Sequence, residues 1–303
     1  DWVDQQKFAE LEQLLAIIQS QNRLGFGLTA ESLRSNIIQE MAKRWTYLHD
    51  NEPDGELVKG LEQWREEGSQ LSMVVNGVRH YRHARNARGR SSNADQKPWS
   101  KYARHIDLCK AELDKAFAML PPPPLVAFDV RIRGLLESSG ELDQVDDWCR
   151  QATQLYPTEL KPHSSVCFQL LPQFSGEYGD SLSFALSVSK MFAGAEADYK
   201  YMRLTAQLTR ALDFRNRIQW RSYDTNRIRR GLEEAFRRGA NTGDDLWFLW
   251  MQFHQRTSDF EAAAQVLEHL MANRAATPKI LTEGDFAQFG PLVRSHCQWI
   301  RSQ

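Results

Sequence analysis

Apolar residues recur every three or four positions along most of the chain, and polar residues occupy the positions between them. This spacing is typical of amphipathic helices, whereas the strict alternation that predicts strands is scarce. The first helix is expected over 2–21. A second follows Thr29 as an N-cap and has Leu33 to Trp45 on one face. Two more are expected, one around Leu57 to Trp64 and one from Ser69 through Tyr81. Further helices are expected over 99–120, 125–138, 142–156, 162–171, 180–192, 197–212, 225–238, 244–255, 260–274 and 286–300.

The helices fall into pairs that recur about every 30–45 residues, which is the spacing of helical repeat proteins. A single pair cannot bury its own apolar face and must stack on its neighbour. The predicted fold is therefore all-α, an α-solenoid of degenerate helix hairpins in one domain over residues 1–303. The polar, glycine-containing stretch 88–97 marks a flexible break between the N-terminal helices, 1–87, and the repeat array, 98–303.

One of these units resembles the second helix of a tetratricopeptide repeat. It runs from Gly140-Glu141-Leu142 through Ala152 to Leu155-Tyr156-Pro157. A wider stretch, about residues 1–215, resembles a bacterial family of uncharacterised tetratricopeptide-like domains in its segments Phe8 to Glu12, Trp64, Ala87-Arg88-Gly89, Ala116 to Leu120 and Leu170-Leu171-Pro172. The resemblance implies a helical fold and carries no assigned activity.

Composition indicates a folded soluble protein, with 42% hydrophobic and 25% charged residues and a net charge of −1. That balance gives no overall attraction to nucleic acid or to anionic lipid. No apolar run reaches membrane-spanning length. The cysteines lie apart from one another, so we expect buried free thiols and a cytoplasmic protein; they are Cys109, Cys149, Cys167 and Cys297. The first residue is Asp1 and not Met, so a removed signal peptide or upstream domain is compatible with the sequence.

Two stretches are rich in arginine. Residues 79–90 contain five arginines, two histidines and no acid, and residues 215–238 interleave arginine with Trp220 and Tyr223. The simplest interpretation is two solvated helix faces, with pairs such as Arg229–Glu233 and Arg230–Glu234 in the second. An acidic protein partner or nucleic acid would also suit arginine beside aromatic rings. The residues expected to contact a partner are Arg79, Arg82, Arg85, Tyr223, Arg227 and Arg230.

The sequence contains little that indicates a catalytic or metal site. His80 and His83 are three residues apart and can share a helix face, but zinc needs further ligands. His105 lies beyond the 88–97 stretch, and the arginines beside the two histidines would repel a cation. We therefore expect no metal, no cofactor and no catalytic residues, although an enzyme with a site in a helical cleft remains a third hypothesis.

The function that the sequence favours is protein–protein interaction without catalysis. The chain would be a bacterial scaffold or adaptor, or an immunity or chaperone-like partner of another, acidic protein. The alternative is a nucleic-acid-binding protein that uses the arginine-rich helix faces, for which affinity would fall steeply with salt.

Overall fold

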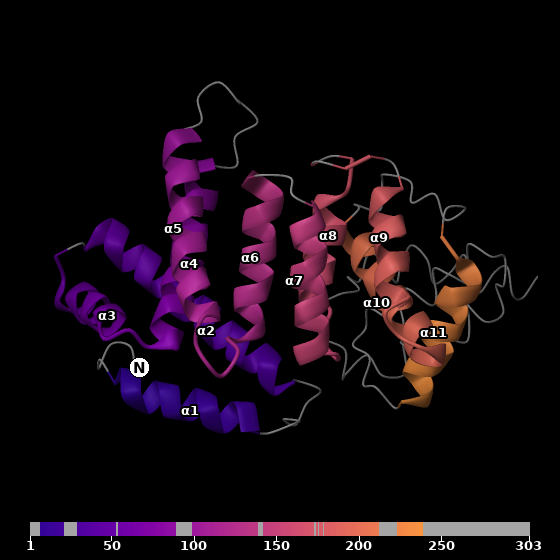
Figure 1. Cartoon of the computed structure of the whole chain (residues 1–303), viewed down its shortest axis with the longest axis horizontal. Helices are drawn as coiled ribbons and strands as arrows, with labels where there is room; N and C mark the ends of the chain where they lie inside the picture. The colour runs from indigo at the N-terminus through magenta and orange to yellow at the C-terminus, as the bar shows by residue number, and fades with distance from the viewer. Residues whose placement is uncertain are drawn as a thin grey trace, which may run out of the picture. The chain divides into compact units, whose positions relative to one another are not determined.

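The computed structural model of the chain describes residues 7–20, 29–52, 54–88, 99–138, 142–172, 174, 176–177, 179–211 and 223–238. Within these residues it contains eleven α-helices and no strand (Figure 1), which confirms the predicted all-α class. The chain divides into two compact units, Asp1–Val166 and Cys167–Gln303. The break predicted over 88–97 lies outside the described residues except for Arg88.

The first unit begins with three amphipathic helices, α1 (Phe8–Ser20), α2 (Ala30–Asn51) and α3 (Glu56–Glu66). Thr29 caps α2 as predicted, because its hydroxyl oxygen accepts a 3.0 Å hydrogen bond from the amide of Ser32. The ring of Trp64 in α3 stacks on Phe8 of α1 with 4.7 Å between ring centroids. The indole of Trp64 also donates to Glu12, so α1 and α3 are held by one side chain.

Helix α4 (Gln70–Arg88) is the centre of this unit and packs along α5 (Trp99–Phe117). The two run antiparallel, since Gln70 contacts Ala116 while His80 contacts His105. Gly77 lies where the helices approach most closely: a Cβ atom there would be 2.8 Å from Cδ2 of Leu113, a fully buried side chain. The absence of a side chain at position 77 therefore allows the two helices to pack this closely here.

Three more helices complete the first unit: α6 (Leu125–Ser138), α7 (Leu142–Leu155) and the start of α8 (Lys161–Gln169). The carboxylate of Glu137 on α6 is buried and joins α4 and α5. It accepts hydrogen bonds of 2.8 Å from the Tyr81 hydroxyl and 2.9 Å from the Tyr102 hydroxyl. It also forms ion pairs with Arg85 and Arg88. One carboxylate thus pairs with two arginines at the end of α4.

The described part of the second unit contains α9 (Asp180–Ser189), α10 (Gly194–Ala211) and α11 (Thr225–Arg237). Helix α10 packs against both of the others. Gly231 of α11 lies against the backbone of Asp198, where a larger residue would collide. The helices predicted over 244–255, 260–274 and 286–300 lie outside the described residues.

Cysteines and membrane segments follow the sequence-based expectations as far as the structure describes them. The thiols of Cys109, Cys149 and Cys167 are free and buried, as predicted, and Cys297 lies outside the described residues. Among the described helices, none is both long and apolar enough for a bilayer crossing.

The close approach at Gly77 predicts a destabilising Gly77→Ala substitution. Alanine normally favours a helix over glycine by about 1 kcal/mol. Here its Cβ would press on the buried Leu113, and overpacking of this kind costs about 1–3 kcal/mol of the unfolding free energy. Urea denaturation followed by circular dichroism measures the change.

The matched control is Gly134→Ala, in the middle of α6, where a Cβ atom meets nothing within 4 Å. This substitution should leave the unfolding free energy unchanged or raise it by up to about 1 kcal/mol. Equal effects of the two substitutions would contradict the role assigned to Gly77.

Candidate functional site

Four histidines and one aspartate gather where α2, α4 and α5 meet. His49 and Asp50 lie in the last turn of α2, His80 and His83 lie on one face of α4, and His105 lies on α5. The antiparallel register of α4 and α5 brings His105 next to His80, although 25 positions separate them in the sequence. We refer to these five residues as the histidine cluster.

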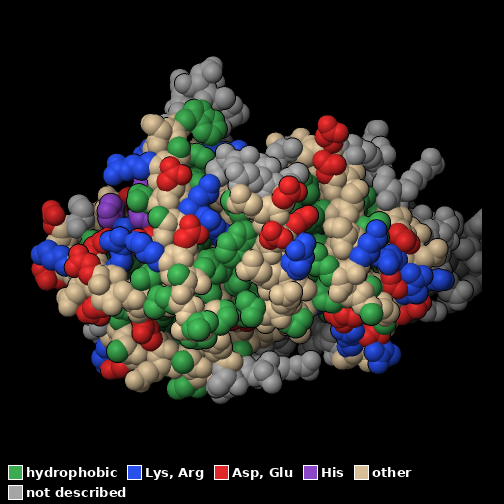
Figure 2. All heavy atoms as spheres, viewed as in Figure 1, with side chains coloured by type: hydrophobic (Ala, Val, Ile, Leu, Met, Phe, Trp, Pro, Cys, Tyr) green, Lys and Arg blue, Asp and Glu red, His purple; other side chains and the backbone are tan. Residues whose placement is uncertain are grey.

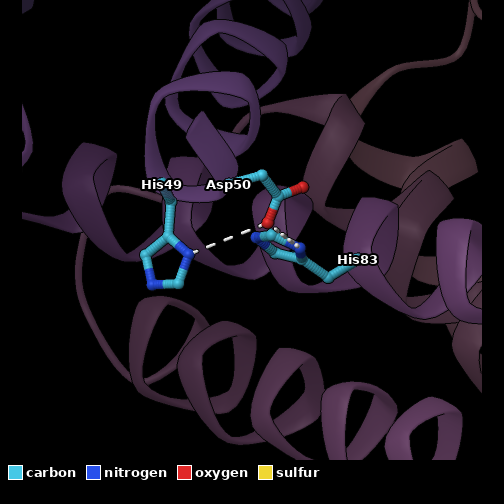
Figure 3. Close-up of side chains that lie close together, drawn as sticks. All are labelled: His49, Asp50 and His83. Atoms are coloured by element: carbon cyan, nitrogen blue, oxygen red, sulfur yellow. Dashed lines mark ion pairs between the residues drawn. The ribbon is translucent and has the colours of Figure 1, made fainter. Parts of the chain in front are cut away.

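The rings of the histidine cluster are in mutual contact. The Nδ1 atoms of His80 and His105 are 3.2 Å apart, and the ring of His105 stacks on that of His83 with 5.0 Å between centroids. The carboxylate of Asp50 lies 3.6 Å from Nδ1 of His83 and 3.9 Å from Nδ1 of His49. Figure 3 shows both imidazoles turned toward that carboxylate from opposite sides.

Burial keeps the α4 imidazoles uncharged. It lowers the pKa of His80 to about 3, and the neighbouring Arg79 and the other histidines act in the same direction. Burial also lowers the pKa of His83 to about 4, with Asp50 opposing the shift and Arg79 adding to it. The pKa of His105 is lowered too, first by burial and then by Lys101 and Arg104. These three rings are therefore neutral at pH 7 and have lone pairs to offer.

The prediction of a solvated basic face is wrong for three basic residues of α4. Arg79, His80 and His83 are 5%, 8% and 6% exposed. The guanidinium of Arg79 lies 3.6 Å from Glu62, donates to Asn76 and covers the ring of Trp45 at 4.6 Å. The sequence-based interpretation failed because α4 is packed by α2, α3, α5 and α6 and has no wide solvent-facing side.

A cavity of about 620 Å³ opens beside the histidine cluster. Lys101, Arg104 and Ser100 line it together with the cluster residues, so its wall combines imidazoles, one carboxylate and cations. In Figure 2 histidine side chains reach the surface here, with Lys and Arg side chains on either side of them.

Two further cavities lie along α4, next to the cavity beside the histidine cluster, which we refer to as the histidine cavity. Two cavities of about 540 and 260 Å³ share Arg82 and Asn86, and the larger one shares Asp50 with the histidine cavity. We refer to these two cavities as the α4 groove. Its lining cations are Lys43, Arg44, Arg82, Arg85, Arg133 and Lys161, and its lining acids are Glu40, Asp50 and Asp129.

Several of the groove cations already have ionic partners. Arg85 pairs with Glu137, and Arg133 pairs with Asp129 and also donates to the Ser165 hydroxyl. Within the described residues, neither Arg82 nor Lys161 forms an ion pair. The Nε atom of Arg82 is also buried without a hydrogen-bond acceptor.

The residues predicted to bind a partner in the second arginine-rich stretch, 215–238, lie in the second unit, next to acidic residues. Tyr223 is buried. Arg227 and Arg230 both pair with the carboxylate of Asp198 on α10. The predicted pair Arg229–Glu233 is present at 4.0 Å, whereas Arg230–Glu234 is wrong, because Glu234 pairs with Arg237 and Arg238. The arginines of this stretch that the structure describes thus have ionic partners within the unit.

Comparison of the chain with protein-family models, with curated proteins and with solved structures finds no match. The resemblance to tetratricopeptide-like domains therefore rests on the sequence segments alone, and inferences about function rest on the histidine cluster and the α4 groove.

The lowered pKa of His80 predicts that metal-free protein loses stability in acid. The folded-state pKa, about 3, lies below the ordinary 6.5, so below pH 6.5 the unfolded state binds a proton that the folded state does not. The contribution of His80 is complete above pH 6.5 and is lost as the pH falls toward 3. In His80→Gln the slope of unfolding free energy against pH should be shallower, by up to about 1.4 kcal/mol per pH unit.

Urea denaturation at several pH values between 7 and 4, with a chelator present, measures that slope for both proteins. Glutamine keeps a polar group beside His105 but does not titrate. An identical slope in the wild type and the variant would show that His80 is protonated in the folded protein.

Proposed function

We propose that this chain is a non-catalytic binding module, and that the α4 groove of its first unit takes up an acidic segment of another protein. The helices would be degenerate tetratricopeptide-like hairpins, and the groove would serve as their binding surface. The protein would then act as a scaffold, an adaptor or a chaperone-like partner.

The observation that carries this proposal is the pair of uncompensated cations, Arg82 and Lys161, at one cavity. A buried guanidinium nitrogen without an acceptor costs free energy, about 1–3 kcal/mol by comparison with other buried polar groups. A carboxylate from a ligand would supply the acceptor and form a charge-assisted hydrogen bond, which is among the stronger kinds.

Charge and shape favour an extended acidic ligand. Six cations and three acids line the α4 groove, whereas the whole chain has a net charge of −1. The two cavities share Arg82 and Asn86 as lining residues, so the cations lie along two adjacent cavities and can contact more than one carboxylate of the same ligand.

An aromatic side chain in the groove favours protein over a simple anion. Tyr47 lines the larger cavity and is 55% exposed. Tyrosine and arginine are enriched among the residues that dominate protein-binding energy. Nucleic acid is less suited to the described residues, because Arg227 and Arg230 of the second arginine-rich stretch already pair with Asp198.

Charge reversal in the groove tests the proposal. A fluorescent oligoglutamate peptide should bind the wild type at low ionic strength. Arg82→Glu and Lys161→Glu should each weaken binding about tenfold, since each removes a charge-assisted contact and adds repulsion. Fluorescence anisotropy measures the dissociation constants.

The matched controls are Arg150→Glu on α7 and Lys59→Glu on α3. Both residues are exposed and lie outside the groove, and the substitutions change the net charge equally. Peptide binding that responds equally to all four substitutions, or no binding at all, would refute the proposal. Tight, salt-sensitive binding of single-stranded DNA without peptide binding would instead support the nucleic-acid alternative.

A further inference from the structure

Three side chains of the histidine cluster present metal-binding atoms to one point. Ligand atoms of His49, Asp50 and His83 all lie within 4.8 Å of one another. They come from the end of α2 and the middle of α4, two helices that pack together. In Figure 3 dashed lines join the carboxylate of Asp50 to both rings.

His83 lacks the partner that a buried imidazole requires. Its Nδ1 lies 3.6 Å from the Asp50 carboxylate, which is too long for a hydrogen bond. This nitrogen therefore has a lone pair or a proton without a hydrogen-bond partner in the part of the chain that the structure describes, and it can be offered to a ligand. The other ring nitrogen, Nε2, is also buried without a partner among the described residues, but it lies on the far side of the ring from Asp50 and is not the atom that would face a bound ion.

We propose that His49, Asp50 and His83 bind a divalent transition-metal ion of the zinc type. Two imidazole nitrogens and one carboxylate oxygen form the ligand set of many zinc sites that keep a fourth position open. Of its three ligands only Asp50 also lines the α4 groove, and the ion can bind without the acidic ligand proposed for the groove.

The distances suit an ion of this size. Bonds of about 2.0–2.2 Å in tetrahedral geometry hold ligand atoms roughly 3.3–3.6 Å apart. The spacings of 3.6 and 3.9 Å between Asp50 and the two rings are already close to this. His49 and Asp50 are about half exposed and can rotate, whereas His83 is buried and provides a fixed ligand.

The arginines next to His80 and His83 in the sequence repel a bound cation less than expected, because two of them are paired with acids. Arg79 is directed to Glu62 and Trp45, Arg85 is paired with Glu137, and Arg82 lines the groove rather than the histidine cavity. Arg79, Lys101 and Arg104 nevertheless line the histidine cavity. Their charge weakens the binding of a free cation, so we expect micromolar rather than nanomolar affinity.

Metal titration of chelator-treated full-length protein at pH 7 tests the site. Isothermal titration calorimetry should show one Zn²⁺ bound per chain, and Co²⁺ should give the visible absorption of a tetrahedral nitrogen and oxygen site. His49→Ala and Asp50→Asn should each weaken Zn²⁺ binding at least tenfold. Both residues are half exposed, so these variants should fold even where His83→Ala does not.

The matched control is Asp54→Asn, an exposed aspartate just beyond α2 that lies outside the cluster. Its Zn²⁺ affinity should equal that of the wild type. Absence of binding, or equal binding by the wild type, His49→Ala and Asp50→Asn, would overturn the proposal. Arg82→Glu should not weaken Zn²⁺ binding, so the metal site and the peptide groove can fail independently.

Discussion

The close contact between Gly77 and Leu113 lies at the packing of α4 against α5, the two helices that carry most of the chemical groups of the first unit. Because position 77 has no side chain, α4 comes close enough to α5 for Leu113 to fill the space above it. That register places His80 opposite His105 one turn later. It also brings Tyr81 and Tyr102 to the same carboxylate, Glu137. The His80–His105 contact and the two tyrosine contacts with Glu137 all depend on α4 packing closely along α5.

The arginines of α4 differ in whether they have a carboxylate partner, and this difference distinguishes those that stabilise the packing of the helix from the one that is proposed to bind a ligand. Arg79 and Arg85 each have a carboxylate partner, supplied by Glu62 and Glu137, and they contribute to the packing of α4. Arg82 lies between them in sequence and has no ionic partner in the described part of the chain. Charge left without compensation at a cavity costs stability unless a ligand supplies the opposite charge. For this reason the groove, and not the basic composition of α4, supports a binding role.

The sequence predicts the helices well because their apolar spacing is local information. The cap at Thr29, the stop after Phe117 and the starts of α6, α7 and α9 lie within a few residues of expectation. The site is harder to predict. His80 and His83 are visible as a spaced pair, but the approach of His105 depends on the packing of α4 against α5, which includes the contact of Gly77 with a residue 36 positions away. Likewise, Arg79 and Arg82 have similar sequence surroundings, and only packing distinguishes the buried one from the one at the groove.

Asp50 belongs to the walls of both the histidine cavity and the α4 groove. A cation held by this carboxylate removes one negative charge from the groove wall, and so favours an acidic ligand there. Thermodynamic linkage makes the effect reciprocal: the acidic ligand would tighten the hold on the cation by the same factor. A single shared side chain is thus sufficient to make the two occupancies cooperative, without any change in the helix arrangement.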